Sequence, residues 1–274
     1  MQNKLYRSGL IVRALSGFYD VKLSDGATLR CRARGVFRNT GESPVVGDHV
    51  DVTDAGHGEG VIYRIKPRSS LLVRPPVANM SQVLWVFSIK EPEWNPFLLD
   101  KFLTMAELQS LKSVILVSKI DLLDNAGLAR LEEEARLYTD IGYPFIPFSS
   151  ISAFNIQRIR EVMKGEMNVL AGQSGVGKTS LLNRLFPSLR HETAAISQKL
   201  GRGKHTTRHV ELLPLEEGGY VADTPGFGEL TPKGIEIEQL ASLFVEFNQY
   251  AGSCRFRSCL HVNEPGCAVC QAVA

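Results

Sequence analysis

Residues 172–179 (Gly-Gln-Ser-Gly-Val-Gly-Lys-Thr) fit the pattern G-x-x-x-x-G-K-[ST] of a phosphate-binding loop. The pattern requires a strand before the glycine turn and a helix after it. Residues 167–171 are mostly apolar and predict the strand, and residues 179–186 predict the helix. Small residues let backbone N–H groups surround a phosphate, and the helix N-terminus adds partial positive charge. The alternative is a glycine-rich turn that binds nothing.

This loop assigns a role to each of its residues. Lys178 is expected to reach the β- and γ-phosphates, and the Thr179 hydroxyl is expected to be a ligand of Mg²⁺. The other nucleotide contacts are expected from the loop itself and the start of the helix, at Gly172, Gln173, Ser174, Gly175, Val176, Gly177 and Ser180.

A second phosphate motif, Asp223-Thr-Pro-Gly226, follows a predicted strand at residues 220–222. Asp223 at a strand end is expected to hold Mg²⁺ through a bound water, and Gly226 is expected to let a backbone N–H approach the γ-phosphate. The pattern D-x-x-G is weak alone, and an unrelated aspartate turn is the alternative. After a strand and a phosphate loop, it favours a nucleotide hydrolase.

Ser118-Lys119-Ile120-Asp121 follows a predicted strand at residues 113–117 and indicates which base is bound. A carboxylate at Asp121 accepts two hydrogen bonds from N1–H and the 2-amino group of guanine, and adenine lacks that donor pair. The stem of Lys119 is expected to cover the base. The GTPase pattern is N-K-x-D, and Ser118 replaces its asparagine. Ser149 and Ser150, after a strand at 145–148, are expected to close over guanine O6.

These motifs occur in an unusual order. In common GTPases the phosphate loop comes first and the base-reading motifs come last, whereas here residues 118–121 and 149–150 precede Gly172. The parts of the domain are therefore present in a circularly permuted chain. Such a permutation is physically permissible because the termini of a domain often lie close together.

The pattern around the motifs predicts a doubly wound α/β domain. Strands at 82–89, 113–117 and 145–148 alternate with helices at 96–109, 127–141 and 156–164, which indicates a parallel sheet with ligands at the carboxyl ends of its strands. Asn95 is a plausible N-cap of the first helix. Beyond the phosphate loop, the sequence predicts paired strands at 209–215 and 219–222, and a helix at 239–250.

The first 70 residues predict a small all-β barrel of the OB-fold type, with a linker at 67–79. The candidate strands are short and evenly spaced, at 10–12, 17–23, 28–33, 48–53 and 60–65. Up to residue 68 there are eleven basic and seven acidic residues. A nucleic-acid surface is one interpretation, and a solvated strand face with its aromatics in the core is the other. The residues expected in such a surface are Arg30, Arg32, Arg34, Arg38, Phe18, Tyr19 and Phe37.

Four of the five cysteines lie between positions 254 and 270. Cys254-x₄-Cys259-x-His261-x₅-Cys267 supplies four ligands for a closed tetrahedral Zn²⁺ site, with Cys270 as a possible replacement for Cys267. Free cysteines in a small core are the alternative. Because no signal peptide or membrane-length apolar run is visible, we expect a cytoplasmic protein without membrane contact.

Taken together, these residues resemble the circularly permuted, ribosome small-subunit-dependent GTPases called RsgA, YjeQ or YloQ. Residues 172–179, 223–226, 118–121, 201–208 and the cysteine cluster carry the resemblance. It implies an OB-fold at 1–70, a GTPase domain at 71–230 and a small α-helical zinc domain at 231–274, with one zinc held by Cys267 rather than Cys270. It also implies a monomer that binds the small (30S) ribosomal subunit and its 16S rRNA, and hydrolyses GTP to GDP late in that subunit's maturation.

Residues 201–208 lie where the first switch of a GTPase belongs, so Thr206 or Thr207 is expected to bind Mg²⁺ and sense the γ-phosphate. Phe227 occupies the position where many GTPases place a glutamine that orients water. His205 is therefore the candidate for that role, with Lys178 and Thr206 as the other catalytic residues, while contact of His205 with phosphate or RNA is the alternative. Two other functions stay open: an RNA-binding protein with a structural nucleotide, and an ATP-dependent kinase or motor.

Overall fold

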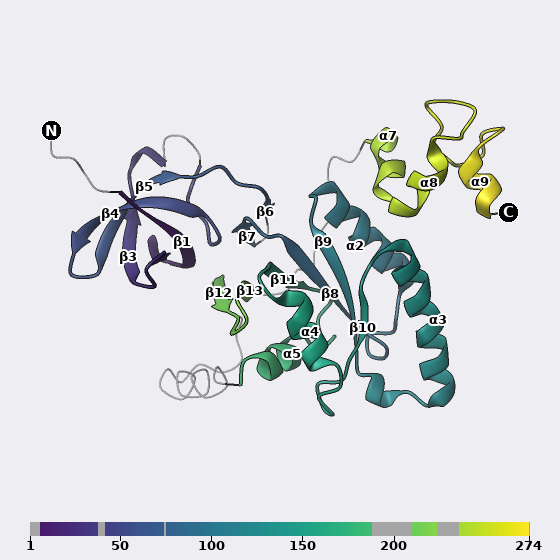
Figure 1. The fold of residues 1–274 in the computed structure, drawn as a ribbon, viewed down its shortest axis with the longest axis horizontal. Coiled ribbons are helices and arrows are strands. Elements are labelled where there is room, and N and C mark those ends of the chain that lie inside the picture. The colour runs from purple at the N-terminus through teal and green to yellow at the C-terminus, as the bar shows by residue number, and fades with distance from the viewer. Residues whose placement is uncertain (1–5, 38–41, 74, 188–209, 224–235, 274) are drawn as a thin grey trace.

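The computed structural model describes residues 6–37, 42–73, 75–187, 210–223 and 236–273. It contains an N-terminal barrel, a central α/β domain and a small C-terminal module. The barrel and the module lie at opposite ends of the molecule (Figure 1). No helix in these ranges is long and apolar enough to cross a lipid bilayer.

The N-terminal barrel has five strands: β1 (Tyr6–Leu15), β2 (Phe18–Leu23), β3 (Thr28–Ala33), β4 (His49–Gly56) and β5 (Glu59–Ile65). They pair in the order β1-β2-β3-β5-β4, and β1 closes the barrel on β4. Inward side chains at alternate positions fill it, including the fully buried Ile11, Val21, Cys31 and Ile62. The predicted OB-like barrel is confirmed. Strand β1 is longer than the predicted 10–12, because its first residues pair with Val50–Thr53 of β4.

The segment predicted as a linker, 67–79, contains two strands that the sequence analysis did not predict. Strands β6 (Leu71–Val73) and β7 (Pro76–Ala78) form a two-stranded antiparallel sheet. Val77 is fully buried and bridges to Val46 of the barrel. The Arg68 guanidinium also donates to the buried Asp48 carboxylate at 2.7 and 2.8 Å. Burial of apolar side chains against the barrel thus outweighs the turn-forming tendency of the two prolines.

The central domain contains the predicted parallel sheet. Its strands are β8 (Gln82–Ser88), β9 (Lys112–Ser118), β10 (Phe145–Pro147), β11 (Met167–Ala171), β12 (Glu211–Pro214) and β13 (Tyr220–Asp223). Their order is β10-β9-β8-β11-β13-β12, and only β12 runs antiparallel to its neighbour β13. The predicted β12–β13 hairpin is therefore confirmed.

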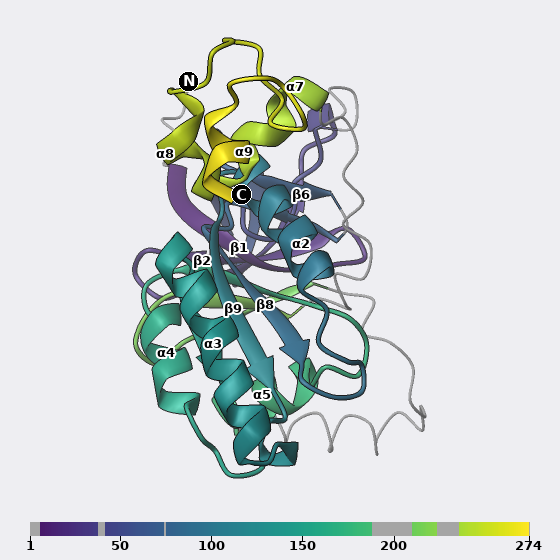
Figure 2. The ribbon, with the colours of Figure 1, turned by 90° about the vertical axis from the view of Figure 1, so that its right-hand side faces the viewer.

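Helices cover both faces of this sheet (Figure 2). On one face lie α2 (Pro96–Leu108) and α3 (Asn125–Ile141), and on the other α4 (Ile156–Met163) and α5 (Lys178–Leu185). The Asn95 side chain caps α2 by accepting from the N–H of Leu98 at 3.0 Å, as predicted. A 3₁₀ turn, η1 (Ile120–Leu122), follows β9.

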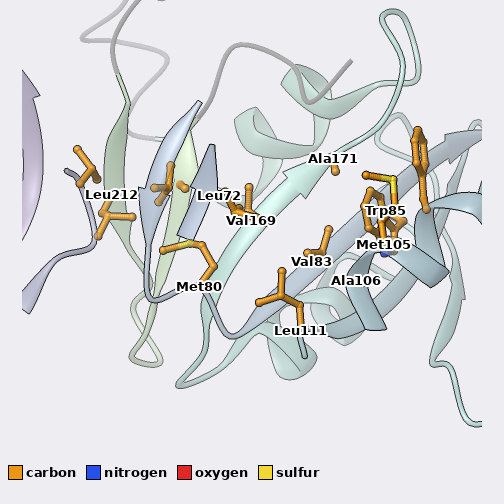
Figure 3. Close-up of a cluster of buried hydrophobic side chains, with 14 of the residues drawn as sticks. Leu72, Met80, Val83, Trp85, Met105, Ala106, Leu111, Val169, Ala171 and Leu212 are labelled. Atoms are coloured by element: carbon orange, nitrogen blue, oxygen red, sulfur yellow. The ribbon is translucent and has the colours of Figure 1, made fainter. Parts of the chain in front are cut away.

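Strand β8 is buried along its whole length because both of its faces are covered. Val83, Trp85 and Phe87 belong to one hydrophobic cluster, which includes α2 and α3, whereas Leu84 and Val86 belong to the cluster of α4 and α5. Figure 3 shows Val83 and Trp85 with Met105 and Ala106 of α2 in the first cluster.

The barrel is joined to the central sheet through β12. A register pair between Arg13 of β1 and Glu211 of β12 makes one continuous eleven-stranded sheet. The Lys22 ammonium lies 5.8 Å from the centre of the Tyr220 ring, and apolar residues from the barrel and from β12, including Ile11 and Leu212, share one hydrophobic cluster. The barrel therefore packs on the β12–β13 hairpin.

The C-terminal module is built from short helical turns, so the predicted continuous helix at 239–250 was wrong. The turns are α7 (Ile237–Leu240), η2 (Ala241–Leu243), η3 (Val245–Phe247) and α8 (Asn248–Ala251), and α9 (Ala268–Val273) follows the cysteines. Phe244 interrupts the helix with φ −91° and ψ 96°. Its ring stacks on Phe247 at 5.2 Å, and it lines a small cavity with Tyr138 of α3. The module therefore lies beside α2 and α3 (Figures 1 and 2).

Candidate nucleotide and metal sites

The phosphate-loop motif forms the turn between β11 and α5. Gly172 has φ +147°, and a Cβ there would lie 2.1 Å from the carbonyl oxygen of Val86. Gly177, at φ +98°, precedes the first residue of α5. Only glycine fits at position 172, and the positive φ at position 177 favours glycine. An open cavity of about 480 Å³ is lined by the loop and the start of the helix, at Gly172, Ser174, Gly175, Gly177, Lys178, Thr179 and Ser180.

The Lys178 ammonium lies within this loop. It donates to the carbonyl oxygens of Gly172 at 2.7 Å and Gln173 at 2.6 Å. Burial lowers the pKa of Lys178 below its usual value, because the charged form loses contact with water. An anionic phosphate in the cavity would restore the missing opposite charge, so the loop fits a polyphosphate.

Ser118 connects the base motif to the phosphate loop. Its buried hydroxyl donates to the carbonyl oxygen of Val176 at 2.6 Å. The serine that replaces the asparagine of N-K-x-D therefore makes its own hydrogen bond to the neighbouring loop. This contact keeps the ends of β9 and β11 in a fixed relation, with the intervening β8 between them.

Asp121 and Ser149 meet at the carboxyl ends of β9 and β10. The Ser149 hydroxyl donates to the Asp121 carboxylate at 2.5 Å, and it accepts from the N–H groups of Ile151 and Ser152 at 3.2 Å each. Lys119 adopts φ +62°, and its ammonium donates to the Glu91 carbonyl at 2.6 Å. The two predicted base-reading segments are thus brought together beside the phosphate loop.

Arg184 is a polar residue of this region that the motifs do not reveal. It lies in the last turn of α5, and its guanidinium donates to the carbonyl oxygens of Ser150 at 2.6 Å and Ile151 at 2.9 Å. The sequence holds no local signal for this contact, because the partners are more than thirty positions apart.

Some predicted residues lie outside the described part of the chain, namely Arg38, His205, Thr206, Thr207, Gly226 and Phe227. Asp223 is the last residue of β13. Because Ala222 pairs with Val169 of β11, the end of β13 lies next to the strand that leads into the phosphate loop. This backbone position suits a motif that acts on the same phosphates.

The predicted metal ligands form a cluster in the C-terminal module. One ligand atom from each of Cys254, Cys259, His261 and Cys267 lies within 4.8 Å of all the others. Nδ1 of His261 is 3.6 Å from Sγ of Cys254 and 3.4 Å from Sγ of Cys267. In a tetrahedral site, a sulfur at about 2.3 Å and a nitrogen at about 2.0 Å from zinc lie about 3.5 Å apart, so these separations suit a zinc site.

Cys270 does not belong to this set. Its thiol points to the carbonyl oxygens of His261 and Val262, at 3.5 and 3.7 Å. Its backbone N–H instead donates to Sγ of Cys267 at 3.3 Å, and this contact is the largest of the causes that lower the pKa of the Cys267 thiol to about 6. A thiolate is the form that binds metal.

Glu264 fixes the turn that carries His261. Its carboxylate accepts from the backbone N–H groups of Leu260, Val262 and Asn263 at 2.8–3.1 Å. These bonds lower the pKa of Glu264 to about 2, with the Leu260 N–H as the largest cause. The turn holds His261 at φ +61°, a conformation that the glutamate stabilises.

The barrel carries a surface of arginines stacked on aromatic rings, which we call the arginine–aromatic face. Arg30 and Arg32 lie 4.5 and 4.6 Å from the centre of the Phe18 ring, and Arg34 lies 4.4 Å from that of Tyr63. Tyr6 packs on Tyr63 at 4.6 Å. Two of the expected surface aromatics, Tyr19 and Phe37, instead pack partly buried against the core.

Comparisons with known proteins agree with this architecture. The model of the RsgA N-terminal domain matches residues 8–62, and that of the RsgA GTPase matches residues 65–232. A protein of Geobacillus sp. strain WCH70 described as "Small ribosomal subunit biogenesis GTPase RsgA" is 48% identical over 265 residues, which cover 97% of this chain and 90% of that protein. The protein of that description from Geobacillus thermodenitrificans is 49% identical over 96% of this chain and 89% of its own length.

Two solved structures are also similar over nearly the whole chain. The crystal structure of YjeQ from Thermotoga maritima matches with a TM-score of 0.86 at 37% identity, covering 98% of this chain and 91% of that one. The structure of "YloQ, a circularly permuted GTPase" matches with a TM-score of 0.84 at 37% identity, covering 100% and 90%. With the phosphate loop, the base motif and the permuted order in place, this chain belongs to the RsgA family of circularly permuted GTPases.

Proposed function

We propose that this protein binds the small (30S) ribosomal subunit and hydrolyses GTP to GDP and phosphate late in that subunit's maturation. The observation that carries the proposal is the arrangement of Asp121 and Lys178 on two loops, after β9 and after β11, which the hydrogen bond from Ser118 to Val176 links. The relatives described as small ribosomal subunit biogenesis GTPases support the choice of partner.

In this proposal the phosphate loop binds the β- and γ-phosphates, with Lys178 as the positive charge. The exposed Thr179 hydroxyl and the carboxylate at the end of β13 would hold Mg²⁺, which neutralises charge that develops on the phosphates. Asp121 reads N1–H and the 2-amino group of guanine, and the loop at Ser149 and Ser150 closes over O6.

For hydrolysis, His205 positions the attacking water, because Phe227 has no group that hydrogen-bonds to it. Thr206 and Thr207 respond to the γ-phosphate. The small subunit raises turnover by holding this segment in its active arrangement, and the products leave the protein in a state of lower affinity for the subunit. Hydrolysis therefore sets the time of release.

The barrel and the C-terminal module contact the subunit in this proposal. The guanidinium groups of Arg30, Arg32 and Arg34 neutralise phosphates of 16S rRNA, and the Phe18 and Tyr63 rings beneath them offer stacking surfaces for unpaired bases. Cys254, Cys259, His261 and Cys267 hold one structural zinc ion, since four protein ligands leave no position for substrate. The protein acts as a cytoplasmic monomer with domains at 1–70, 71–230 and 231–274.

Phosphate release from GTP, with ATP as control, tests the proposal in the absence and presence of purified small ribosomal subunits. Slow GTP turnover that rises strongly with the subunit is expected, and a His205→Ala variant is expected to keep GTP affinity and lose the stimulation. No turnover would favour an RNA-binding protein with a structural nucleotide. Preference for ATP would favour a kinase or motor, and turnover that ignores the subunit would overturn the proposed partner.

A further inference from the structure

We propose that Arg184 is a positioning residue for guanine recognition, which holds the base loop (residues 149–152) to the phosphate-loop helix α5. The inference rests on the proposed function, because it takes Asp121, Ser149 and Ser150 as the base-reading residues. Arg184 itself contacts neither base nor phosphate in this scheme. It acts through the backbone of the loop.

The contact has the geometry of a two-point clamp. Nε of Arg184 donates to the Ser150 carbonyl at 2.6 Å, and a terminal nitrogen donates to the Ile151 carbonyl at 2.9 Å. The rigid guanidinium fork holds two successive peptide groups in one orientation, which a single-point donor cannot do. The Ile151 side chain itself is 77% exposed, so packing of that side chain does not fix the loop.

The base loop is also held by its own first residue, Ser149. The hydroxyl of this buried residue accepts from the N–H groups of Ile151 and Ser152 and donates to Asp121. Arg184 donates to the carbonyl groups of this turn, and the N–H groups of the same turn donate to the Ser149 hydroxyl. The orientation of the Asp121 carboxylate and the path of the loop over the base therefore depend on both contacts.

A second arginine connects the helix that follows the base loop to the end of α5. Arg160 of α4, the helix after the base loop, donates to the carbonyl oxygens of Arg184 and Leu185 at 3.3 and 2.5 Å. These carbonyls at the end of α5 lack partners within the helix. Arg160 thus links α4 to the end of α5, Arg184 links the base loop to α5, and α5 begins at the phosphate loop. The base loop and the phosphate loop consequently behave as one rigid unit.

This unit favours guanine only while the loop stays in place. A backbone N–H held over position 6 of the base donates a hydrogen bond to guanine O6, whereas it faces the amino group of adenine, which is also a donor, unfavourably. If the loop is released, the hydrogen bond to guanine O6 weakens, and the unfavourable contact with the amino group of adenine becomes smaller. Loss of Arg184 is therefore expected to reduce affinity for GDP without reducing affinity for ADP, because the phosphate loop is untouched.

The test compares Arg184→Met and Arg184→Lys with the control Arg158→Met, which changes an exposed arginine of α4. Dissociation constants for GDP and for ADP, the latter titrated into the millimolar range, are measured by competition with a fluorescent GDP analogue. Arg184→Met is expected to weaken GDP roughly tenfold and ADP less than about twofold, with Arg184→Lys in between, since a lysine replaces only one of the two bonds. Arg158→Met is expected to match the wild type.

Equal weakening of GDP and ADP binding, or an unchanged ratio of the two dissociation constants, would overturn the positioning role. Arg184 would then be only a stabilising residue of α5. A double-mutant cycle with Ser149→Ala gives a second reading. Because both residues hold one loop, the double variant is expected to lose less GDP affinity than the product of the two single losses, whereas independent losses would contradict the inference.

Asp121→Asn separates this inference from the proposed function. An asparagine offers a donor to the 2-carbonyl of xanthine, so the variant is expected to prefer xanthosine diphosphate over GDP. If it does not, Asp121 is not the base reader and the proposed function fails at that residue. If it does, while Arg184→Met leaves the ratio of GDP to ADP affinity unchanged, only the role of Arg184 fails.

Discussion

Single hydrogen bonds decide how the nucleotide motifs are placed relative to each other. Ser118 of β9 donates to the Val176 carbonyl of the phosphate loop. Ser149, which follows β10, donates to Asp121 in the turn after β9. Both serines are buried. Leaving a buried acceptor without its donor costs about 1–3 kcal/mol. Loss of either hydrogen bond is therefore expected to disturb the nucleotide site.

Ser118→Ala tests the first of these bonds. The variant leaves the Val176 carbonyl without its donor, and the phosphate loop is expected to bind nucleotide less well. We expect the affinity for GDP to fall roughly tenfold, which corresponds to about 1.4 kcal/mol. Titration calorimetry with GDP measures it. Ser24→Ala in an exposed barrel turn is the control, and equal affinities of both variants would contradict the coupling.

Glu166 makes a pH-dependent contribution to the free energy of unfolding. Its carboxylate accepts from the Lys112 ammonium and the Ser81 hydroxyl, each at 2.6 Å, and these contacts lower the pKa of Glu166 below its usual 4.5. The side chain of Glu166 is 23% exposed. A carboxylate whose pKa is lower in the folded state stabilises that state above the unfolded pKa, and the contribution is lost as pH falls.

Glu166→Gln is therefore expected to lower the free energy of unfolding at pH 7 by about 0.5–1 kcal/mol and to have less effect at pH 4. Urea unfolding at both pH values measures the difference between variant and wild type, so that acid effects elsewhere cancel. Glu161→Gln, at an exposed position of α4, serves as the control. A difference that grows as pH falls would contradict the assigned sign.

Among the elements, the C-terminal module depends least on a hydrophobic core. Its helical turns are three to six residues long, and among its described residues, 236–273, only Cys267 and Val269 are buried and apolar. Isolated turns of this length are not stable in water. The cysteine cluster and the Glu264 turn must therefore supply the order that packing supplies elsewhere.

Cys267→Ser and Cys270→Ser form a matched pair for this site. The first removes a member of the cluster, and the second removes a thiol that points to backbone carbonyls. We expect the wild type and Cys270→Ser to bind one zinc ion per chain and Cys267→Ser to bind it weakly, as measured by metal analysis after dialysis. Equal zinc contents in the two variants would contradict the assignment of Cys267.

Removal of zinc with a chelator extends the same prediction to the whole element. Amide hydrogen exchange is expected to accelerate in residues 236–273 and to change little in β8, β9 and β11, since those strands are buried by the sheet's own helices. Exchange that accelerates equally in both regions would show that the metal stabilises the entire protein.

At the scale of the whole molecule, the β12–β13 hairpin connects three parts. It forms the side of the central sheet that faces the barrel, and it carries Asp223 at its end. It also pairs with β1 of the barrel. The arginine–aromatic face lies on the same barrel, along β2, β3 and β5. A change at the end of β13 therefore has a short, continuous route through paired strands to the proposed RNA surface.

The arginine–aromatic face is tested by the salt dependence of RNA binding. Replacing Arg30, Arg32 and Arg34 together by Ala is expected to reduce the slope of log affinity against log salt by about 2, because each lost phosphate contact lowers it by about 0.7–0.9. Fluorescence anisotropy with a 16S rRNA fragment between low and high salt measures the slope. Arg64→Ala changes an arginine paired with Asp51, and it is expected to keep the slope.

The amino-acid sequence by itself determined the chemistry of the nucleotide site and the order of its parts. The phosphate loop, the Asp121 segment and the cysteine cluster are recognisable because each needs particular residues at close spacing, and neighbouring positions fix their local conformation. The alternation of strands and helices followed in the same way from periodicity. These features depend on contacts within a few residues.

Contacts between distant residues were decided only by the tertiary structure. The pairing of β6 with β7 depends on burial of Val77 against the barrel, and the break at Phe244 depends on the stacked Phe247 and the nearby helices α2 and α3. The Arg184 clamp and the β1–β12 pair likewise join segments that no local pattern relates. Local propensities are worth less than the free energy of burying apolar surface and satisfying buried polar groups, and the partners that do this are chosen only when the chain folds.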